Sequence, residues 1–525
     1  MKSSRDLLKQ YNDNPISGWD LIVISSRDER QRSAFERQLD EMKQNNRHFI
    51  TDEFNFLVVS DEQFVRQTNG TKKLGSGGST LFIFRYLLEQ FGDNYISNHK
   101  ILLIHSGGYS QRLPHYSILG KLFSNLPIEL NSDDNKYWTA LDVKLALLAP
   151  FATLMSTGVW ITASDDIVIY SYDESEMKNL SQFASDSIVC LGHPSDVDIS
   201  VTHGVYVLDD QTLPMINSRT VSMHNCLQVL QKPTVDELTK FGAFVLNGTL
   251  QHCITDSSYY LGSDVIVDRL LKYPVHSLDE ELDCYGHFLC PLGSDPVSNY
   301  GDNKFKSPLN QLLSDVHFKV LVLSQSKFIH LGTIGEYIYE MTDYSDKELA
   351  KSLCFRSQNH SDSDVIKGTV ICSQINVDSV VDRHSVVEFC NFADIPIVTN
   401  RNLLYNCILE KRTDRSLEVL KFPVNYLLYS VPVTIDDGVN GWCTLGCCLD
   451  SQLKSELWSS NIFPVCETNE KSLLATLELI DGNFNDLSLS TNVTKLSMSS
   501  VKDWQNTQLI VEMRLPDLVS VVLEG

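Results

Sequence analysis

The sequence lacks the features that would place the chain in a membrane or outside the cell. No apolar run reaches the roughly 18 residues needed to cross a bilayer. The first residues, Met1-Lys2-Ser3-Ser4-Arg5-Asp6, carry charge where a secretory signal would be apolar. The 13 cysteines are scattered, and none form a Cys-x-x-Cys pair. This usage is typical of reduced thiols, so we expect a cytoplasmic protein that binds no membrane.

Positive charge is also scarce. The 525 residues include 43 lysines and arginines against 67 aspartates and glutamates, a formal net charge of −24. That balance argues against general binding to nucleic acids or anionic lipids. Cations that bind phosphate would have to form a local positive patch. With 42% hydrophobic residues, the chain can bury a large core, in two or three domains.

A glycine-rich segment, Ile104-His-Ser-Gly-Gly-Tyr-Ser-Gln-Arg-Leu-Pro114, is the most informative part of the sequence. It follows the apolar run at residues 100–104, which predicts a buried strand. Gly107 and Gly108 allow a sharp turn whose backbone N–H groups can face an anion. Arg112 and, shortly afterwards, Lys121 add two cations. A strand, a glycine turn and two cations together predict a triphosphate-binding loop.

The order of residues in this loop narrows its class. No Gly-x-x-x-x-Gly-Lys-Ser/Thr spacing is present, and Ser110 is followed by Gln-Arg, which excludes the Gly-x-Ser-x-Gly elbow of hydrolases. Gly-Gly-x-Ser-x-Arg-Leu followed by Lys resembles the signature loop of sugar-1-phosphate nucleotidyltransferases, in which a glycine usually stands at the position of Ser110. The alternative interpretation is a tight strand-to-helix turn with two solvated cations.

A second glycine-rich segment precedes an amphipathic stretch at residues 81–91. Its glycines Gly75, Gly77 and Gly78, followed by Ser79, predict a helix start with free N–H groups, which is a second candidate site for phosphate or base. The same segment superficially resembles the Gly-x-Gly-Ser-Ser loop of small-molecule kinases. A sugar kinase such as an L-fucokinase is therefore one alternative function.

Paired carboxylates follow the apolar strand expected at residues 158–162. Oxygen ligands at the carboxyl end of a strand, near a triphosphate, are what Mg²⁺ requires, so Asp165 and Asp166 are candidate ligands for this cofactor. An exposed turn at the strand end is the alternative. The position matches the Gly-Asp of the nucleotidyltransferases. His330 stands where many relatives have a metal-binding aspartate, which puts a second protein carboxylate at the metal in doubt.

Hydrophobic patterning predicts the architecture. Strand and helix patterns alternate through about residue 340, which predicts an α/β fold with a doubly wound, mainly parallel sheet. Strands are expected at residues 19–25, 56–60, 100–104, 158–162, 167–170, 187–191, 205–208 and 320–323. We expect a catalytic domain at 1–343, a polar linker or helix at 344–364 and a β-rich domain at 365–525. In that domain Ile375, Val381 and Val387 fall six residues apart, as in β-helix coils; an irregular β-sandwich is the alternative.

Several further segments together resemble the fucose-1-phosphate guanylyltransferase family within that superfamily. They are the full Ser-Gly-Gly-Tyr-Ser-Gln-Arg-Leu-Pro loop and residues 77–80, 120–123, 163–167, 281–286 and 457–466. The resemblance implies a nucleotidyltransferase-like Rossmann fold and conversion of GTP and β-L-fucose 1-phosphate into GDP-β-L-fucose and pyrophosphate. Composition and spacing alone indicate only NTP-dependent transfer to a phosphorylated small molecule.

The resemblance also implies roles for single residues. Arg112 would bind the β- and γ-phosphates, Lys121 the α-phosphate and leaving group, and Lys232, in Gln231-Lys232-Pro233, the fucose phosphate. The segments 192–194 and 202–206 would face the sugar. The expected substrate-binding residues are His203, Gly204, Asp256, Asp283 and His330.

Two other interpretations remain open at this stage. A non-catalytic nucleotide-sugar sensor could keep the same fold, although it would not need Arg112, Lys121, Asp165 and Lys232 together. Zinc binding by Cys284-x-x-His287-x-x-Cys290 lacks a fourth ligand at a recognisable spacing, and the segment has the pattern of an amphipathic helix. The sequence does not determine the oligomeric state.

Overall fold

The computed structural model describes residues 1–15, 18–44, 49–67, 74–108, 110–128, 138–209, 216, 218–247, 250–274, 281–296, 306–342, 347–355, 365–409, 418–434, 440–450, 462–480 and 495–496. The chain divides into two compact units. The first consists of Met1–Arg32, Phe49–Gly108 and Leu141–His330, and the second of Ser33–His48, Tyr109–Ala140 and Leu331–Gly525. No helix within the described ranges is long and apolar enough to span a membrane.

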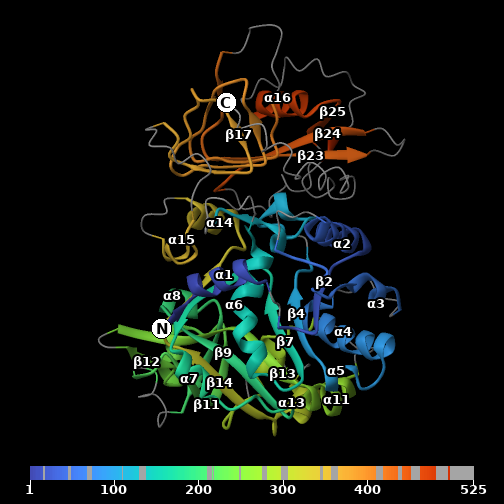
Figure 1. The fold of residues 1–525 in the computed structure, drawn as a ribbon, viewed down its shortest axis with the longest axis vertical. Helices are drawn as coiled ribbons and strands as arrows, with labels where there is room; N and C mark the ends of the chain where they lie inside the picture. Colours follow the sequence, from blue (N-terminus) through green and yellow to red (C-terminus); the bar gives the residue numbers. More distant parts are fainter. Residues whose placement is uncertain are drawn as a thin grey trace. The chain divides into compact units, whose positions relative to one another are not determined.

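The first unit is built on one large mixed sheet (Figure 1). In spatial order its strands are β10 (Gly204–Leu208), β11 (Val221–Gln231), β14 (His317–Leu323), β9 (Ser187–Ser195), β13 (Leu250–Gly262), β7 (Gly158–Ala163), β4 (Lys100–His105), β2 (Leu21–Ser26) and β3 (Phe56–Ser60), with β12 (Phe244–Asn247) beside β13. The pairs β3–β2, β2–β4, β4–β7 and β9–β14 are parallel. The long strands β11 and β13 run antiparallel to their neighbours.

The expected strands of this sheet are confirmed to within a few residues, but β11 and β13 were not predicted. Because these two strands lie inside the sheet, it is mixed: strands that share a direction are separated by strands that oppose them. The coarse α/β class is therefore right. Most strands of the sheet run in one direction, as expected of a mainly parallel sheet, but several of them pair with a strand that runs the opposite way.

The central strands β2, β4 and β7 are buried along nearly their whole length, because helices cover both faces of the sheet. On one face Val23, Leu103 and Ile161 share an apolar cluster with Leu81 and Phe84 of α4 (Gly75–Phe91). On the other face the ring of Trp160 in β7 stacks on Phe151 of α6 (Ala140–Leu154), at 5.2 Å between centroids. Figure 1 shows α6 and α4 on opposite sides of β4 and β7.

Shorter elements complete the first unit. A small sheet joins β1 (Lys2–Ser3), β8 (Asp166–Tyr172) and β15 (Ser326–His330). The remaining helices that lie at least partly in this unit are α1 (Ser4–Asp13), α2 (Glu29–Gln44), α3 (Asp61–Gln67), α5 (Tyr95–Asn98), α7 (Glu174–Lys178), α8 (Val197–Ser200), α10 (Val235–Lys240), α11 (Ser263–Asp268), α12 (Gly286–Leu289), α13 (Lys306–Leu313) and a 3-10 turn at Leu270–Lys272.

Among its described residues, the second unit contains three ladders of mostly short parallel strands. The longest joins β16 (Thr369–Ile371), β18 (Val386–Glu388), β21 (Leu403–Tyr405) and β23 (Tyr426–Thr434). The other two pair β17 (Gln374–Ile375) with β19 (Asn391–Phe392), and β20 (Ile397–Val398) with β22 (Leu420–Lys421). Val381 and Val387 lie in the apolar cluster that these ladders enclose, and Ile375 packs against it.

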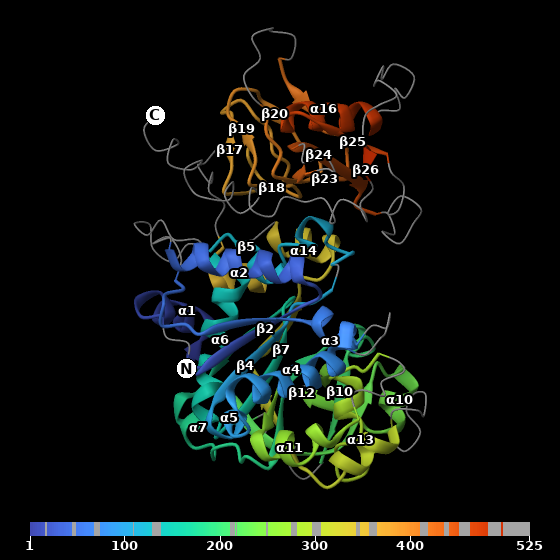
Figure 2. The same ribbon diagram turned by 90° about the vertical axis from the view of Figure 1, so that its right-hand side faces the viewer.

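Beyond these ladders the sheet continues antiparallel through β24 (Asn440–Cys448), β25 (Phe463–Cys466) and β26 (Lys495–Leu496). Figure 2 shows α16 (Asn469–Ile480) beside β24 and β25. The unit also includes β5 (Asn125–Leu126), β6 (Trp138–Thr139), α14 (Ile334–Met341), α15 (Glu348–Leu353) and 3-10 turns at Pro114–Tyr116 and Lys121–Phe123.

The domain boundaries expected at 343 and 365 stay predictions. Of the expected linker, residues 347–355 are described and contain α15, whereas 344–346 and 356–364 lie outside the described residues. The second unit also takes in two earlier segments, so the compact units do not follow one another simply along the chain.

Candidate active site

Candidate functional residues of the first unit follow the ends of four neighbouring parallel strands. The strands β3, β2, β4 and β7 are adjacent and share one direction, so their carboxyl ends meet at one edge of the sheet. Asp61, Arg27, Gly107 and Asp165 follow these four ends closely. In open α/β sheets this edge is where ligands bind.

The glycine turn after β4 is open. Gly107 is exposed, and a Cβ added to it would meet only ordinary contacts, the nearest being the backbone nitrogen of Arg27 at 3.5 Å. Gly108 has φ +113, a conformation that disfavours a side chain although nothing lies within 4 Å of such a Cβ. Its carbonyl accepts a hydrogen bond from Gln31 Nε2 at 3.2 Å. The turn therefore has the geometry expected of a loop that approaches a ligand closely.

Asp61 is a residue that the sequence analysis missed. It follows β3 directly, and its Oδ1 accepts a 2.6 Å hydrogen bond from Ser79 Oγ. Burial raises the pKa of the Asp61 carboxyl to about 7, against a smaller lowering by that hydrogen bond. The rule that selected Asp165, a carboxylate after a buried strand, would also have selected Asp61.

The second glycine segment is tied to another part of the chain. The N–H of Gly77 donates to Leu282 O at 2.6 Å, so this group at the start of α4 is not free as expected. A Cβ on Gly75 would lie 2.4 Å from Leu282 O, and one on Gly77 would lie 2.9 Å from Leu282 Cγ. These two glycines are thus required by close packing. Gly78 and Ser79 are buried in the same helix.

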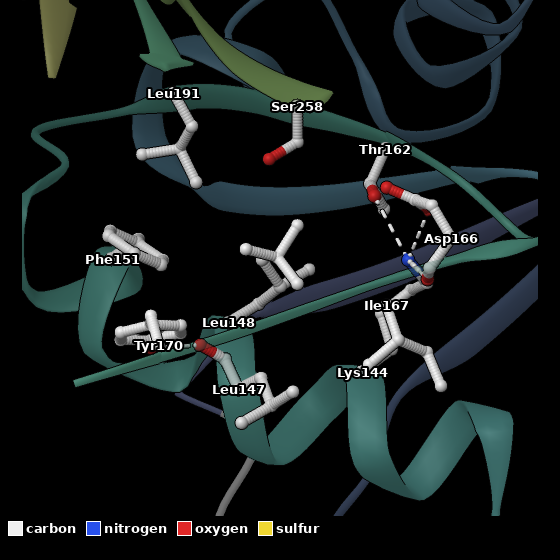
Figure 3. A pocket seen from close by; sticks show the side chains of 11 residues that line it. Lys144, Leu147, Leu148, Phe151, Thr162, Asp166, Ile167, Tyr170, Leu191 and Ser258 are labelled. Carbon is white, nitrogen blue, oxygen red and sulfur yellow. Dashed lines mark hydrogen bonds and ion pairs between the residues drawn. The ribbon is translucent and has the colours of Figure 1, made fainter. Parts of the chain in front are cut away.

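The two adjacent aspartates have different environments. Asp166 is buried, and its Oδ1 lies 2.7 Å from Lys144 Nζ, which also donates to the Asp166 carbonyl and to Thr162 Oγ1 (Figure 3). Burial raises the pKa of Asp166, and Lys144 partly lowers it. Asp165 keeps a side-chain exposure of 23%, with its Oδ2 3.4 Å from His330 Nε2. Asp165 is therefore the accessible member of the pair.

The surroundings of the pair limit what can bind there. The cavity beside Lys144 and Asp166 has a volume of about 20 Å³, which is room for one water and not for a substrate. Within the described ranges, no cluster of three or more His, Cys, Asp or Glu side chains could hold a metal ion. Asp165 would thus be a single protein carboxylate on a metal that takes its other oxygens from the substrate and water.

Three of the expected substrate-binding residues come together although they are far apart in sequence. The N–H of Gly204 donates to Asp256 Oδ1 at 3.1 Å, and a Cβ on Gly204 would lie 2.3 Å from Asp256 Oδ2. Asp283 accepts from the backbone N–H groups of Tyr285 and Gly286, at 3.1 and 3.3 Å. Burial raises the pKa of Asp256 to about 6, which the nearby charge of His203 opposes and that of Asp283 reinforces.

Two buried polar atoms in this cluster have no hydrogen-bond partner within the described residues: the hydroxyl of Tyr285 and Oε1 of Gln231. Burial raises the pKa of Tyr285 well above its usual value, and the neighbouring Cys284, Asp166, Asp256 and Asp283 raise it further. Buried polar groups are normally paired. These two are therefore candidate ligand-binding groups, which the sequence analysis did not select.

Lys232 follows Gln231 in a strained conformation. Its φ is +49, its side chain is exposed, and its N–H donates to His203 O at 3.0 Å. Non-glycine residues with positive φ concentrate at functional sites. His193, by contrast, has a buried side chain, although it belongs to the segment 192–194 that was expected to face the sugar. It is buried in β9 between Ser257 Oγ at 2.6 Å and Ser326 Oγ at 2.9 Å.

The rest of the signature loop belongs to the second unit. Ser110 has φ +44, so it keeps the left-handed backbone conformation that favours the usual glycine at this position. Arg112 is exposed, and its carbonyl accepts from the N–H of Ile334 at 2.9 Å. Lys121 Nζ donates to Gly332 O at 2.9 Å. This contact joins the lysine to the segment that follows His330.

Comparison with known proteins agrees with these features. The family model described as the fucose pyrophosphorylase domain matches residues 93–457. The fucose-1-phosphate guanylyltransferase of Homo sapiens is 29% identical over 91% of this chain and 86% of its own length, and that of Mus musculus is 28% identical over 92% and 91%. The L-fucokinase/L-fucose-1-P guanylyltransferase of Bacteroides fragilis is 26% identical over 53% of this chain and 27% of its own. Since the family match covers more than half of the chain, from the strand of the glycine loop onward, the chain belongs to the fucose pyrophosphorylase family.

Proposed function

We propose that this protein transfers a guanylyl group from GTP to β-L-fucose 1-phosphate, giving GDP-β-L-fucose and pyrophosphate. The observation that carries the proposal is the family match over residues 93–457, which includes the glycine loop and the Asp165 strand end. Two relatives that align along nearly the whole chain are named for this activity. The open turn at Gly107 and Gly108 supports the assignment.

The reaction needs charge neutralisation more than acid–base catalysis. A phosphate oxygen of fucose 1-phosphate forms a bond to the α-phosphorus of GTP, and the bond from that phosphorus to the β-phosphate oxygen breaks as pyrophosphate leaves with the electron pair. The attacking phosphate is already ionised, so no general base is required. From the motif we assign Arg112 to the β- and γ-phosphates and Lys121 to the α-phosphate, with Gly107 and Gly108 donating N–H groups.

Mg²⁺ is part of this proposal. The accessible carboxylate of Asp165 fits a hard oxygen-binding cation, whereas Asp166 is already paired with Lys144. When bound, Mg²⁺ would offset negative charge on the phosphate oxygens. Lys144 holds Asp166 and thereby the strand end that carries Asp165. His330, 3.4 Å from Asp165, replaces a second carboxylate.

The sugar phosphate would bind at the cluster around Asp256. Lys232 would bind its phosphate, since a charge-assisted contact to phosphate suits an exposed ammonium group on a constrained turn. The fucose ring offers hydroxyl groups that can both donate and accept. The buried carboxylate of Asp256, together with Asp283 and the unpaired polar atoms of Tyr285 and Gln231, matches such groups.

The test is a panel of nucleoside triphosphates and sugar 1-phosphates with Mg²⁺, scored for pyrophosphate release. GTP with fucose 1-phosphate should release pyrophosphate and form GDP-fucose. A kinase would instead form a nucleoside diphosphate from GTP and free fucose, and a sensor would bind nucleotide sugar without turnover. The kinase alternative has weaker support, because the family that matches is the pyrophosphorylase domain.

We further infer three finer properties. The sheet edge that carries the glycine turn favours a nucleotidyltransferase-like Rossmann fold. The three ladders of short parallel strands, with Val381 and Val387 in their core, favour a β-helical stack. The 13 cysteines, all within the described residues, form no disulfide, which favours a reducing, cytoplasmic location.

A further inference from the structure

The carboxylate of Asp61 lies beside the glycine turn, and the reaction described above gives it no role. A Cβ on Gly107 would lie 3.7 Å from Asp61 Oδ2. Gly107 is exposed and has no side chain, so no Cβ of residue 107 lies against this oxygen. Any other residue at position 107 would place atoms against the carboxylate.

One oxygen of this carboxylate is anchored and the other is available. Ser79 Oγ donates to Oδ1 at 2.6 Å, whereas no hydrogen bond or ion pair reaches Oδ2 from the described part of the chain. Burial also raises the pKa of Asp61 to about 7, because the hydrogen bond from Ser79 offsets only part of the cost of burying the charge. A perturbed carboxylate of this kind is typical of a functional site.

The place of Asp61 along the sheet edge restricts which group it can meet. Asp165 follows β7 and Asp61 follows β3, and these strands are three ladder steps apart, about 14 Å at the usual strand spacing. The glycine turn after β4 lies between them. Because the carboxylate would repel phosphate, we expect the phosphates on the Asp165 side of the turn, away from Asp61. The nucleoside is then the part of the nucleotide that would lie at the β3 end of this edge.

Guanine offers what this carboxylate lacks. Its N1–H and its 2-amino group are two donors on one edge, and a carboxylate accepts both. Adenine has no such pair, hypoxanthine lacks the amino group, and xanthine presents a C2 carbonyl that would repel the carboxylate. We propose that Asp61, oriented by Ser79, accepts hydrogen bonds from the Watson–Crick edge of guanine and thereby selects GTP. The inference rests on the proposed function, in which GTP is the nucleotide substrate.

The test compares the wild-type chain with Asp61→Asn in pyrophosphate release from GTP, ITP, XTP and dGTP, with fucose 1-phosphate and Mg²⁺. If the amide oxygen keeps the hydrogen bond from Ser79 Oγ that Oδ1 accepts in the wild type, the amide N–H₂ faces the base and donates to the C2 carbonyl of xanthine. The wild type should favour GTP over ITP by about tenfold or more. In Asp61→Asn, kcat/KM for GTP should fall about tenfold to hundredfold and the XTP/GTP ratio should rise at least about hundredfold.

Two further variants separate base recognition from folding. Ser79→Ala should weaken GTP use several-fold while keeping GTP ahead of XTP, because the carboxylate remains. Asp52→Asn changes an exposed carboxylate that precedes β3. It should alter neither the use of GTP nor the preference for GTP over XTP. Thermal unfolding of each variant verifies that it is folded, and Asp61→Asn removes a carboxylate that burial disfavours.

If kcat/KM falls by the same factor for GTP and XTP in folded Asp61→Asn, the inference is overturned. A loss that is much smaller for dGTP would also overturn it, since that would indicate a ribose contact. Calorimetric binding of GTP and XTP to both proteins gives the same comparison without turnover. If the wild type releases no pyrophosphate from any nucleotide, the proposed function fails, while the binding ratio still decides the role of Asp61.

Discussion

Asp165 and Asp166 are adjacent in sequence, yet their replacement by asparagine should have opposite effects. Asp166 is 4% exposed and paired with the 6%-exposed Lys144 at 2.7 Å. Removing one partner of a buried pair typically costs about 3–5 kcal/mol. In Asp166→Asn, Lys144 would keep Thr162 Oγ1 and the residue-166 carbonyl as acceptors. We therefore expect a loss of stability at the lower end of this range, about 3 kcal/mol.

Asp165→Asn should leave the fold nearly unchanged, because its pairing with His330 is partly exposed and worth about 1 kcal/mol or less. It should, however, abolish Mg²⁺-dependent turnover. The assays are chemical unfolding for stability and pyrophosphate release for turnover, with both variants measured at the same pH and salt.

A double variant, Lys144→Met with Asp166→Leu, provides the control. It replaces the buried pair by apolar side chains, a change that is often neutral or stabilising, so stability and turnover should largely recover. If Asp166→Asn is stable but inactive while Asp165→Asn stays active, Asp166 is the metal ligand and the reasoning from burial is wrong.

Three other predictions follow from the same geometry. Lys121→Ala should lower turnover at least about 100-fold with the fold intact, because its ammonium meets charge that develops in the transition state; unchanged turnover at normal stability would refute this role. Lys232→Ala should raise KM for fucose 1-phosphate about tenfold to hundredfold and hardly change KM for GTP, whereas Arg112→Ala should weaken GTP first; equal effects on both substrates would make the Gln-Lys-Pro match a coincidence. The pKa of Asp61 is raised to about 7 in the folded chain, so the native state holds an extra proton between about pH 4 and 7 and loses that stabilisation as pH rises. The melting temperature of the wild type should therefore fall relative to Asp61→Asn between pH 5 and 8, and parallel curves would contradict the assigned pKa.

The sequence by itself determined the local chemistry of the site. The glycines at 107 and 108, the cations at 112 and 121 and the apolar strand before them are consecutive or nearly so, and such a turn can be recognised from residue types alone. Ser110 shows that the local backbone follows the motif even where the residue differs. Its φ of +44 is the left-handed conformation that favours the glycine usual at this position. Strands that are continuous apolar runs were likewise predictable, whereas β11 and β13, which contain several polar residues, were not predicted.

Only the tertiary structure decided what each polar residue can do. Asp165 and Asp166 look equivalent in sequence, and the difference between them comes from Lys144, which lies on a helix more than twenty positions away. The sequence places Asp61 at a strand end, but only the fold shows what lies near it, because β3 and β4 flank β2 and bring its carboxylate beside Gly107.

The same holds for Gly204, Asp256 and Asp283, which β10, β13 and a distant turn bring together. Glycine shows the contrast most clearly. Gly108 serves a turn, which is local, whereas Gly75 and Gly77 make room for the backbone of Leu282, which is not. Residue type and spacing determine turns and periodicity. Burial, pairing and pKa depend on long-range contacts, which only the folded chain provides.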